Sequence, residues 1–188
     1  MIPYILHSIF VFLHVRRIKD NYSHLRKPLR DLIFDNSIDL RGWEMSTNIL
    51  PIIFIIPYFQ KNGFNAFIFF IKFFSIIIAI RTISSTITDI PSSNPKCSTI
   101  KENLSWKNYI SGHCFDKIFS GHTAATLLLI MIARKYNLLS INKTIILIFL
   151  QILFVYFFLI CTRGHYSVDV FLSYVIVIPL FSSLQDEI

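Results

Sequence analysis

The sequence predicts an all-α polytopic membrane protein, folded as a bundle of about six transmembrane helices in a single domain spanning residues 1–188. Hydrophobic residues make up 54% of the chain, and its mean hydropathy is +0.58. Together with 19 phenylalanines, this is more apolar surface than a soluble domain of 188 residues can bury. No internal repeat or low-complexity linker divides the chain.

Six apolar runs, each close to the roughly 20 residues that span a bilayer, form the predicted helices. The first run lacks the basic region and the cleavage site of a signal peptide, so we expect it to be a helix. The third contains Lys72, whose insertion costs about 2.5–3.5 kcal/mol unless it faces protein or reaches the interface. The short runs suit a thin membrane of the early secretory pathway. The runs are Ile2–Val15, Met45–Phe59, Asn62–Ile80, Ile118–Ala133, Thr144–Cys161 and Val170–Leu184.

Two histidine motifs lie at the ends of apolar runs: Ser120–Thr123, which contains His122, and His165–Asp169. Ionisable groups are costly beside hydrocarbon, so histidines and a carboxylate in these positions are functional candidates. If each of the last five runs crosses the membrane, counting the crossings places both motifs on one membrane face. The two long polar segments, before the second run and after the third, lie on the same face.

Within the second motif, a helix would place His165 and Asp169 on one face, one turn apart. The carboxylate can then accept one ring N–H, fix the tautomer and leave the other nitrogen nucleophilic. A purely structural helix start, with Asp169 favoured by the helix dipole, explains this motif alone about equally well.

The first motif also has two interpretations. Ser120 or Thr123 can cap a helix there, and Gly121 can serve a turn. Alternatively, His122 at a helix start is well placed to contact a phosphate. The presence of two such motifs on one membrane face favours catalysis.

The two motifs resemble the signatures of the sphingomyelin synthase family, within the lipid phosphate phosphatase superfamily. Residues 114–123 are similar to the first signature, Cys-Gly-Asp, three residues, then Ser-Gly-His-Thr, although Phe115 replaces the glycine. Residues 165–170 are similar to the second, His-Tyr-Ser/Thr, one residue, then Asp-Val.

The resemblance covers residues 28 to 180, in the family's order. Residues 28–35 resemble the family's Pro-Leu-Pro-Asp segment, with Arg30 in place of a proline. Further along, Arg81, Thr88 and Pro91 match the spacing of an Arg…Thr-x-Leu-Pro segment.

The resemblance implies an enzyme that moves phosphocholine or phosphoethanolamine from a glycerophospholipid to ceramide. His165, oriented by Asp169, would attack the phosphorus and form a phosphohistidine, while His122 protonates the departing diacylglycerol. The alternatives are a phosphatidylcholine:diacylglycerol cholinephosphotransferase, a lipid phosphate phosphatase, and a catalytically idle membrane protein that binds lipid.

Further residues are expected to bind substrate. Arginines can contact a phosphoryl oxygen, whereas carboxylates and aromatic faces suit a choline or ethanolamine ammonium group. We expect no cofactor and no nucleic-acid partner. We also expect no metal, because no histidines or cysteines recur at zinc-like spacing. The oligomeric state is left open. The expected binding residues are Arg81, Glu102, Asp116, Ser120, Arg163 and Tyr166.

The sequence favours transfer of a diester over hydrolysis of a monoester. Lipid phosphate phosphatases carry Lys, six residues and Arg-Pro, with an arginine six residues before the nucleophilic histidine. This chain has no Arg-Pro, and that second position is Leu159. A phosphate monoester has up to two negative charges to bind, whereas a choline-capped diester has one.

Two arguments disagree on which side of the membrane the histidine motifs lie. The face with the histidines carries 13 of the 18 Lys and Arg residues, and the positive-inside rule would place it in the cytosol. The resemblance implies a lumenal or exoplasmic site in the Golgi, endoplasmic reticulum or plasma membrane, and we favour it. Cys97 and Cys114 share a loop and can form a disulfide if it is lumenal, whereas Cys161 is expected to be buried.

Overall fold

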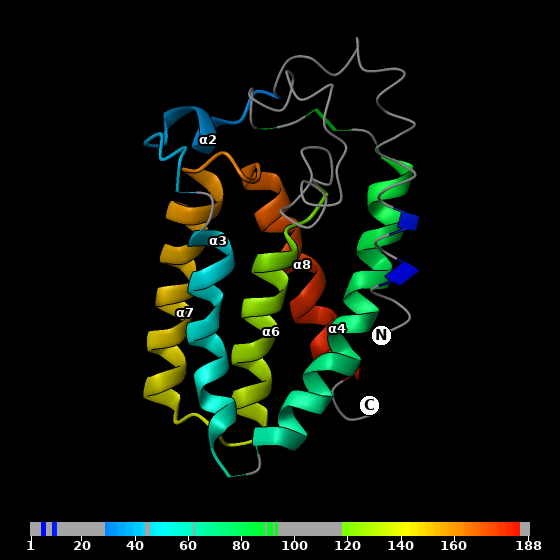
Figure 1. The fold of residues 1–188 in the computed structure, drawn as a ribbon, viewed down its shortest axis with the longest axis vertical. Coiled ribbons are helices and arrows are strands. Elements are labelled where there is room, and N and C mark those ends of the chain that lie inside the picture. The colour runs from blue at the N-terminus through cyan, green and yellow to red at the C-terminus, as the bar shows by residue number, and fades with distance from the viewer. Residues whose placement is uncertain are drawn as a thin grey trace.

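The structure, a computed structural model, describes residues 5–6, 9–10, 29–43, 46–61, 63–88, 90–91, 93 and 118–184. Every regular element among them is a helix, which confirms the predicted fold class. Five long segments stand side by side with alternating direction (Figure 1). The elements are α2 (Leu32–Asn36), α3 (Ser46–Ile49) with η2 (Leu50–Phe59), α4 (Gly63–Ile87), α6 (Gly121–Lys135), α7 (Ile141–Val155) with η4 (Tyr156–Ile160), and α8 (Ser167–Leu184).

The composition of these helices supports membrane association. Three of the described segments are long and apolar enough to cross a membrane: α4, α7 with η4, and α8. Ile145 and Phe149 on α7 and Phe171 on α8 expose large apolar side chains, as surfaces that face lipid do. Five of the six predicted runs correspond to the five long segments, and the run Ile2–Val15 lies mostly outside the described residues.

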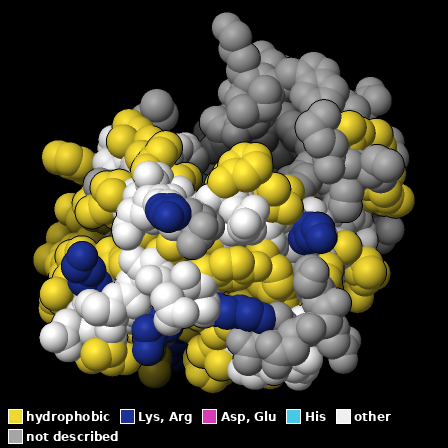
Figure 2. Space-filling view, turned by 90° about the horizontal axis from the view of Figure 1, so that it is seen from below, with side chains coloured by type: hydrophobic (Ala, Val, Ile, Leu, Met, Phe, Trp, Pro, Cys, Tyr) yellow, Lys and Arg dark blue, Asp and Glu magenta, His cyan; other side chains and the backbone are white. Residues whose placement is uncertain are grey.

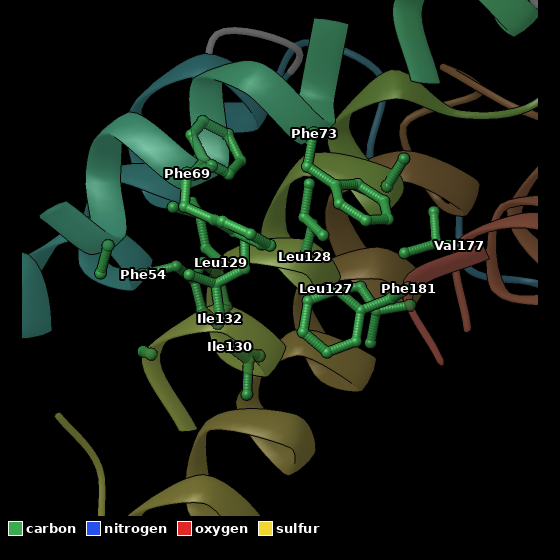
Figure 3. Close-up of a cluster of buried hydrophobic side chains, with 14 of the residues drawn as sticks. Phe54, Phe69, Phe73, Leu127, Leu128, Leu129, Ile130, Ile132, Val177 and Phe181 are labelled. Carbon is green, nitrogen blue, oxygen red and sulfur yellow. The ribbon is translucent and has the colours of Figure 1, made fainter. Parts of the chain in front are cut away.

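Helix α6 is the centre of the bundle, because it packs against η2, α4, α7 and α8. Its Leu128 and Ile132 are completely buried. They meet Phe54 of η2, Phe73 of α4 and Phe181 of α8 in one apolar core (Figure 3). The core fixes the position of α6, and therefore the position of the first histidine motif along the bundle axis.

Helix α4 is longer than the sequence predicts, since the third apolar run ends at Ile80 but the helix continues to Ile87. The hydroxyls of the polar turn donate to carbonyls of their own helix: Thr82 to Ile78 at 2.7 Å and Ser84 to Ile80 at 3.0 Å. Such bonds let polar residues continue a helix into the interface. Arg81 is therefore held on a helix.

Two segments depart from α-helical geometry. In η2, Pro51 and Pro57 lack the N–H that an α-helix needs, and the segment is a 3-10 helix. At the end of α7, the Cys161 N–H donates to the Tyr156 carbonyl five residues back, at 3.0 Å, which makes η4 a wide π-helical turn. π-Helical turns often occur at functional sites.

The alternating directions bring both histidine motifs to one end of the bundle, as counting the membrane crossings predicts. The start of α6, the start of α8, the end of α4 and α2 all lie at this end (Figure 1). The opposite end carries Lys61 in a turn, Arg134 and Lys135 at the end of α6, and Lys143 at the start of α7. Figure 2 shows basic side chains spread over that opposite end.

Candidate active site

The loop between η4 and α8 presents His165. Its backbone is tightly bent, because the Leu159 carbonyl accepts the N–H groups of both Gly164 and His165 at 3.0 Å. Arg163 adopts a left-handed conformation with φ of 63°. A Cβ atom on Gly164 would lie 3.2 Å from the Leu159 oxygen, so glycine suits this position. Backbone strain of this kind is concentrated at functional sites.

His165 and Asp169 are in contact, as their spacing predicts. The His165 Nδ1 atom lies 3.3 Å from the Asp169 Oδ2 atom, and the Tyr166 N–H donates to the same oxygen at 3.0 Å. The contact is made across the start of α8, since His165 precedes the helix and does not share a helical face with Asp169. With Nδ1 as the donor, His165 Nε2 carries a lone pair. His165 is only 7% exposed, so water competes weakly for this hydrogen bond.

His122 is the second residue of α6. The Ser120 hydroxyl caps this helix by accepting the Thr123 N–H at 3.2 Å, which confirms the capping interpretation of this motif. His122 Nε2 lies 3.2 Å from the side-chain oxygen of Asn48 on α3. A protonated Nε2 donates in this contact, which orients the ring.

The two motifs are joined directly by hydrogen bonds. The Ser120 N–H donates to the Asp169 carbonyl at 3.1 Å. The hydroxyl of Ser173, one turn further along α8, lies 2.9 Å from the Asp169 carbonyl and 3.1 Å from the Ser120 carbonyl. All three side chains are completely buried. The starts of α6 and α8 therefore form one unit, with His122 two residues after Ser120 and His165 four before Asp169.

Arg81 reaches the first motif from α4. Its Nε–H donates to the Phe119 carbonyl at 3.2 Å. A Cβ atom on Gly121 would lie 3.0 Å from the Arg81 Nη1 atom, so the missing side chain leaves space for the guanidinium group. The structure thus places a positive charge beside the start of α6, one residue from His122.

Arg163, a second expected binding residue, contacts the segment before α3. Its guanidinium group donates to the Ser37 hydroxyl at 3.3 Å and to the Ser37 carbonyl at 3.4 Å. The Arg163 carbonyl accepts the hydroxyl of the buried Ser93 at 2.8 Å. These contacts attach the loop before His165 to two other parts of the chain.

Tyr166 is completely buried, and its hydroxyl connects three segments. It donates to the Pro91 carbonyl at 3.2 Å and accepts the Leu29 N–H at 2.9 Å. Burial raises the pKa of the Tyr166 phenol, and the Asp169 carboxylate nearby raises it further. The hydroxyl therefore stays protonated and able to donate at physiological pH.

The other expected binding residues, Glu102 and Asp116, lie outside the described residues, as do Cys97 and Cys114. Cys161 is a free, buried cysteine, as predicted. In the described part of the chain, no group of three or more metal-ligating side chains is assembled.

Three features of this end are absent from the expectations based on sequence. Asn48 contacts His122, and Asp31 contacts the start of α8. Gln151 donates to the Thr126 hydroxyl at 3.4 Å, and that hydroxyl donates to the His122 carbonyl at 2.8 Å. Polar residues within apolar runs, such as Asn48 and Gln151, are a signal that could have identified two of them.

Residues 113–186 match a protein-family model described as PAP2 superfamily C-terminal. The matched segment contains both histidine motifs and supports an assignment to the lipid phosphate phosphatase superfamily. This superfamily implies an enzyme that handles phosphoesters, with phosphatase or phosphotransferase activity on lipid phosphates. A search of curated protein sequences found no match to the chain.

Proposed function

We propose that the chain is a sphingomyelin synthase-like phosphotransferase, which moves phosphocholine or phosphoethanolamine from a glycerophospholipid to ceramide. The observation that supports this most strongly is the hydrogen-bonded unit formed by the two motifs, Ser120 with Asp169 and Ser173 with both. It holds an oriented histidine beside a helix start that carries a second histidine, which is the arrangement that two-step transfer through a covalent intermediate requires.

In the first step, His165 Nε2 attacks the phosphorus of the donor lipid. The bond between phosphorus and the diacylglycerol oxygen breaks, and His122 gives that oxygen its proton. The negative charge of Asp169 stabilises the ring of His165 as its Nε2 forms the new bond and the ring becomes cationic. The headgroup is then carried as a phosphohistidine.

In the second step, the acceptor hydroxyl gives its proton to His122 and attacks the phosphohistidine. The bond between His165 and phosphorus breaks, which regenerates both histidines. The cycle needs His122 protonated and His165 neutral at its start, so their surroundings must separate their proton affinities. The two histidines have different neighbours: His122 lies by a neutral amide, and His165 by a carboxylate.

Hydrolysis of a phosphate monoester is the second candidate, because it belongs to the same superfamily. The position six residues before His165 argues against it, since Leu159 is a buried apolar side chain there. Arg81 supplies one cation beside the first motif, which matches the single negative charge of a choline-capped diester.

Headgroup transfer is tested with the full chain reconstituted in lipid vesicles. Fluorescent ceramide or diacylglycerol is offered as the acceptor, and the donor headgroup is varied between choline and ethanolamine. We expect a labelled phospho-sphingolipid from wild type, and none from His165→Ala. Equal product from both would refute the mechanism, whereas release of free phosphate from a monoester donor would favour the phosphatase.

We further propose a site on the lumenal or exoplasmic side of a Golgi or endoplasmic reticulum membrane. Access of a membrane-impermeant thiol reagent to Cys97 in sealed vesicles of known orientation tests this proposal. Labelling from the cytosolic side would contradict it, and would exclude a disulfide between Cys97 and Cys114 as well.

A further inference from the structure

The carboxylate of Asp31 contacts the start of α8 directly. Asp31 Oδ2 accepts the Ser167 N–H at 2.7 Å, and the Ser167 hydroxyl lies 2.7 Å from both carboxylate oxygens. The two residues are 136 positions apart in the chain. Asp31 also accepts the Ile33 N–H at 3.1 Å, which fixes the carboxylate on its own segment.

Ser167 stands between the two members of the catalytic pair. It is the first residue of α8, where N–H groups have no partner within the helix. Asp169 accepts the Tyr166 N–H and Asp31 accepts the next N–H along the chain. Two carboxylates therefore hold two successive backbone groups, which fixes the conformation between His165 and Asp169.

The segment that carries Asp31 is itself attached to the same loop at other points. The Leu40 N–H donates to the Cys161 carbonyl at 2.9 Å, and Ser37 accepts bonds from Arg163. Contacts at both ends of the loop mean that the carboxylate is held in place independently of its bond to Ser167. The whole segment, residues 29–43, lies outside the part of the chain that matches the superfamily model.

We infer that Asp31 is a positioning residue, whose carboxylate holds Ser167 so that the His165 imidazole is correctly aimed. This inference rests on the proposed function, since His165 is taken as the nucleophile. Asp31 acts through Ser167, whose N–H and hydroxyl its carboxylate contacts. Its loss should therefore slow the chemical step and leave binding of the donor largely unchanged.

The first test measures kcat and KM for the donor lipid with the full chain in vesicles. Asp31→Ala should lower kcat by about 10–100-fold, the cost of a small misplacement of a reacting group. Asp31→Asn should lose less, because its amide keeps one acceptor oxygen. Asp31→Asn also keeps the size of the side chain, so it provides the test if the alanine variant fails to fold.

Asp39→Asn is the matched control, because it removes a carboxylate of the same segment that bonds to Arg41 rather than to Ser167. Asp39 pairs with Arg41, whose guanidinium group lowers the pKa of that carboxyl to about 2. The control therefore removes one negative charge from the segment at neutral pH. It should keep the wild-type kcat.

Two further measurements separate positioning from general stability. Combining Asp31→Ala with Ser167→Ala should cost no more than the worse single change, since both break one interaction. Hydrogen–deuterium exchange should rise in residues 164–170 of Asp31→Ala and stay unchanged in α4. An unchanged kcat, independent additive losses or unchanged exchange would each overturn the inference. A wild-type chain without turnover would instead refute the proposed function, while exchange would still decide whether Asp31 orders the loop.

Discussion

The two histidine motifs reach the same end of the bundle with different kinds of support. The helix that contains His122 is capped by its own motif, through the Ser120 hydroxyl. The loop that carries His165 is supported from distant parts of the chain, through Asp31 at Ser167 and Leu29 at Tyr166. The first helix start is therefore capped from within its own motif, although distant residues also contact it. At the second helix start, a distant carboxylate accepts the first N–H of α8.

This difference predicts which substitutions should affect each motif. Changes beside His122 should act on this residue, the proposed proton donor, and on its immediate neighbours. The second motif should also respond to changes far away, because residues 29–43 hold the loop. The following substitutions test this contrast between a locally capped motif and one held by distant contacts.

The largest expected effect comes from Asp169→Asn, which keeps the shape of the side chain but removes control of the His165 tautomer. We expect kcat to fall by about 10⁴-fold, as for other histidine–carboxylate pairs. Single-turnover formation of the phosphohistidine measures the loss, with thermal unfolding as a check on folding. A loss as small as that of the Asp39→Asn control would contradict a role for Asp169 in orienting His165.

His122→Ala should lower kcat by about 10²–10⁴-fold, because the leaving oxygen loses its proton donor. A donor lipid analogue with a nitrophenol leaving group needs little protonation, so it should restore most of the rate of the first step. The rate of nitrophenolate release measures this rescue. An equal loss with natural and activated donors would show that His122 does not act as the acid.

Gly121→Ala should displace Arg81, since the new Cβ atom would lie 3.0 Å from its Nη1 atom. We expect kcat/KM to fall by up to about tenfold, because the shifted guanidinium group would contact the donor phosphate less well in the proposed mechanism. Combining Gly121→Ala with Arg81→Lys tests whether the glycine substitution acts through Arg81. If it does, the two losses in kcat/KM should be less than additive. Fully additive losses would mean that Gly121 acts independently of Arg81.

The smallest effects concern stability and compare the two kinds of support directly. Ser120→Ala should cost about 1 kcal/mol through loss of a helix cap. Tyr166→Phe should cost about 1–3 kcal/mol, because the Pro91 carbonyl and the Leu29 N–H lose their partner. Only Tyr166→Phe should also increase proteolysis within residues 29–43. Equal proteolysis of both variants would remove the distinction between the motifs.

Several features of the site could be predicted from sequence because they depend on local spacing or on chain direction. A four-residue spacing predicts the contact of His165 with Asp169, and alternating apolar runs predict the shared end of the bundle. The contacts of Asp31 with Ser167 and of Asn48 with His122 join segments distant in the chain, so no local pattern encodes them. Hydropathy underestimates the length of α4, because it does not register hydroxyls that bond to carbonyls of their own helix.

The wide turn at the end of α7 has a consequence for how this chain tolerates changes in length. A π-helical turn contains one residue more than the α-helical turn it replaces, and such turns can close when one residue is removed. Each residue of an α-helix turns the chain by about 100°. Deleting one residue from the regular part of α7 would therefore rotate everything that follows about the helix axis. Deleting one between Tyr156 and Ile160 would instead close the wide turn and leave His165 near its present orientation. The wide turn would thus absorb a one-residue change in length before the loop that carries His165, the proposed nucleophile.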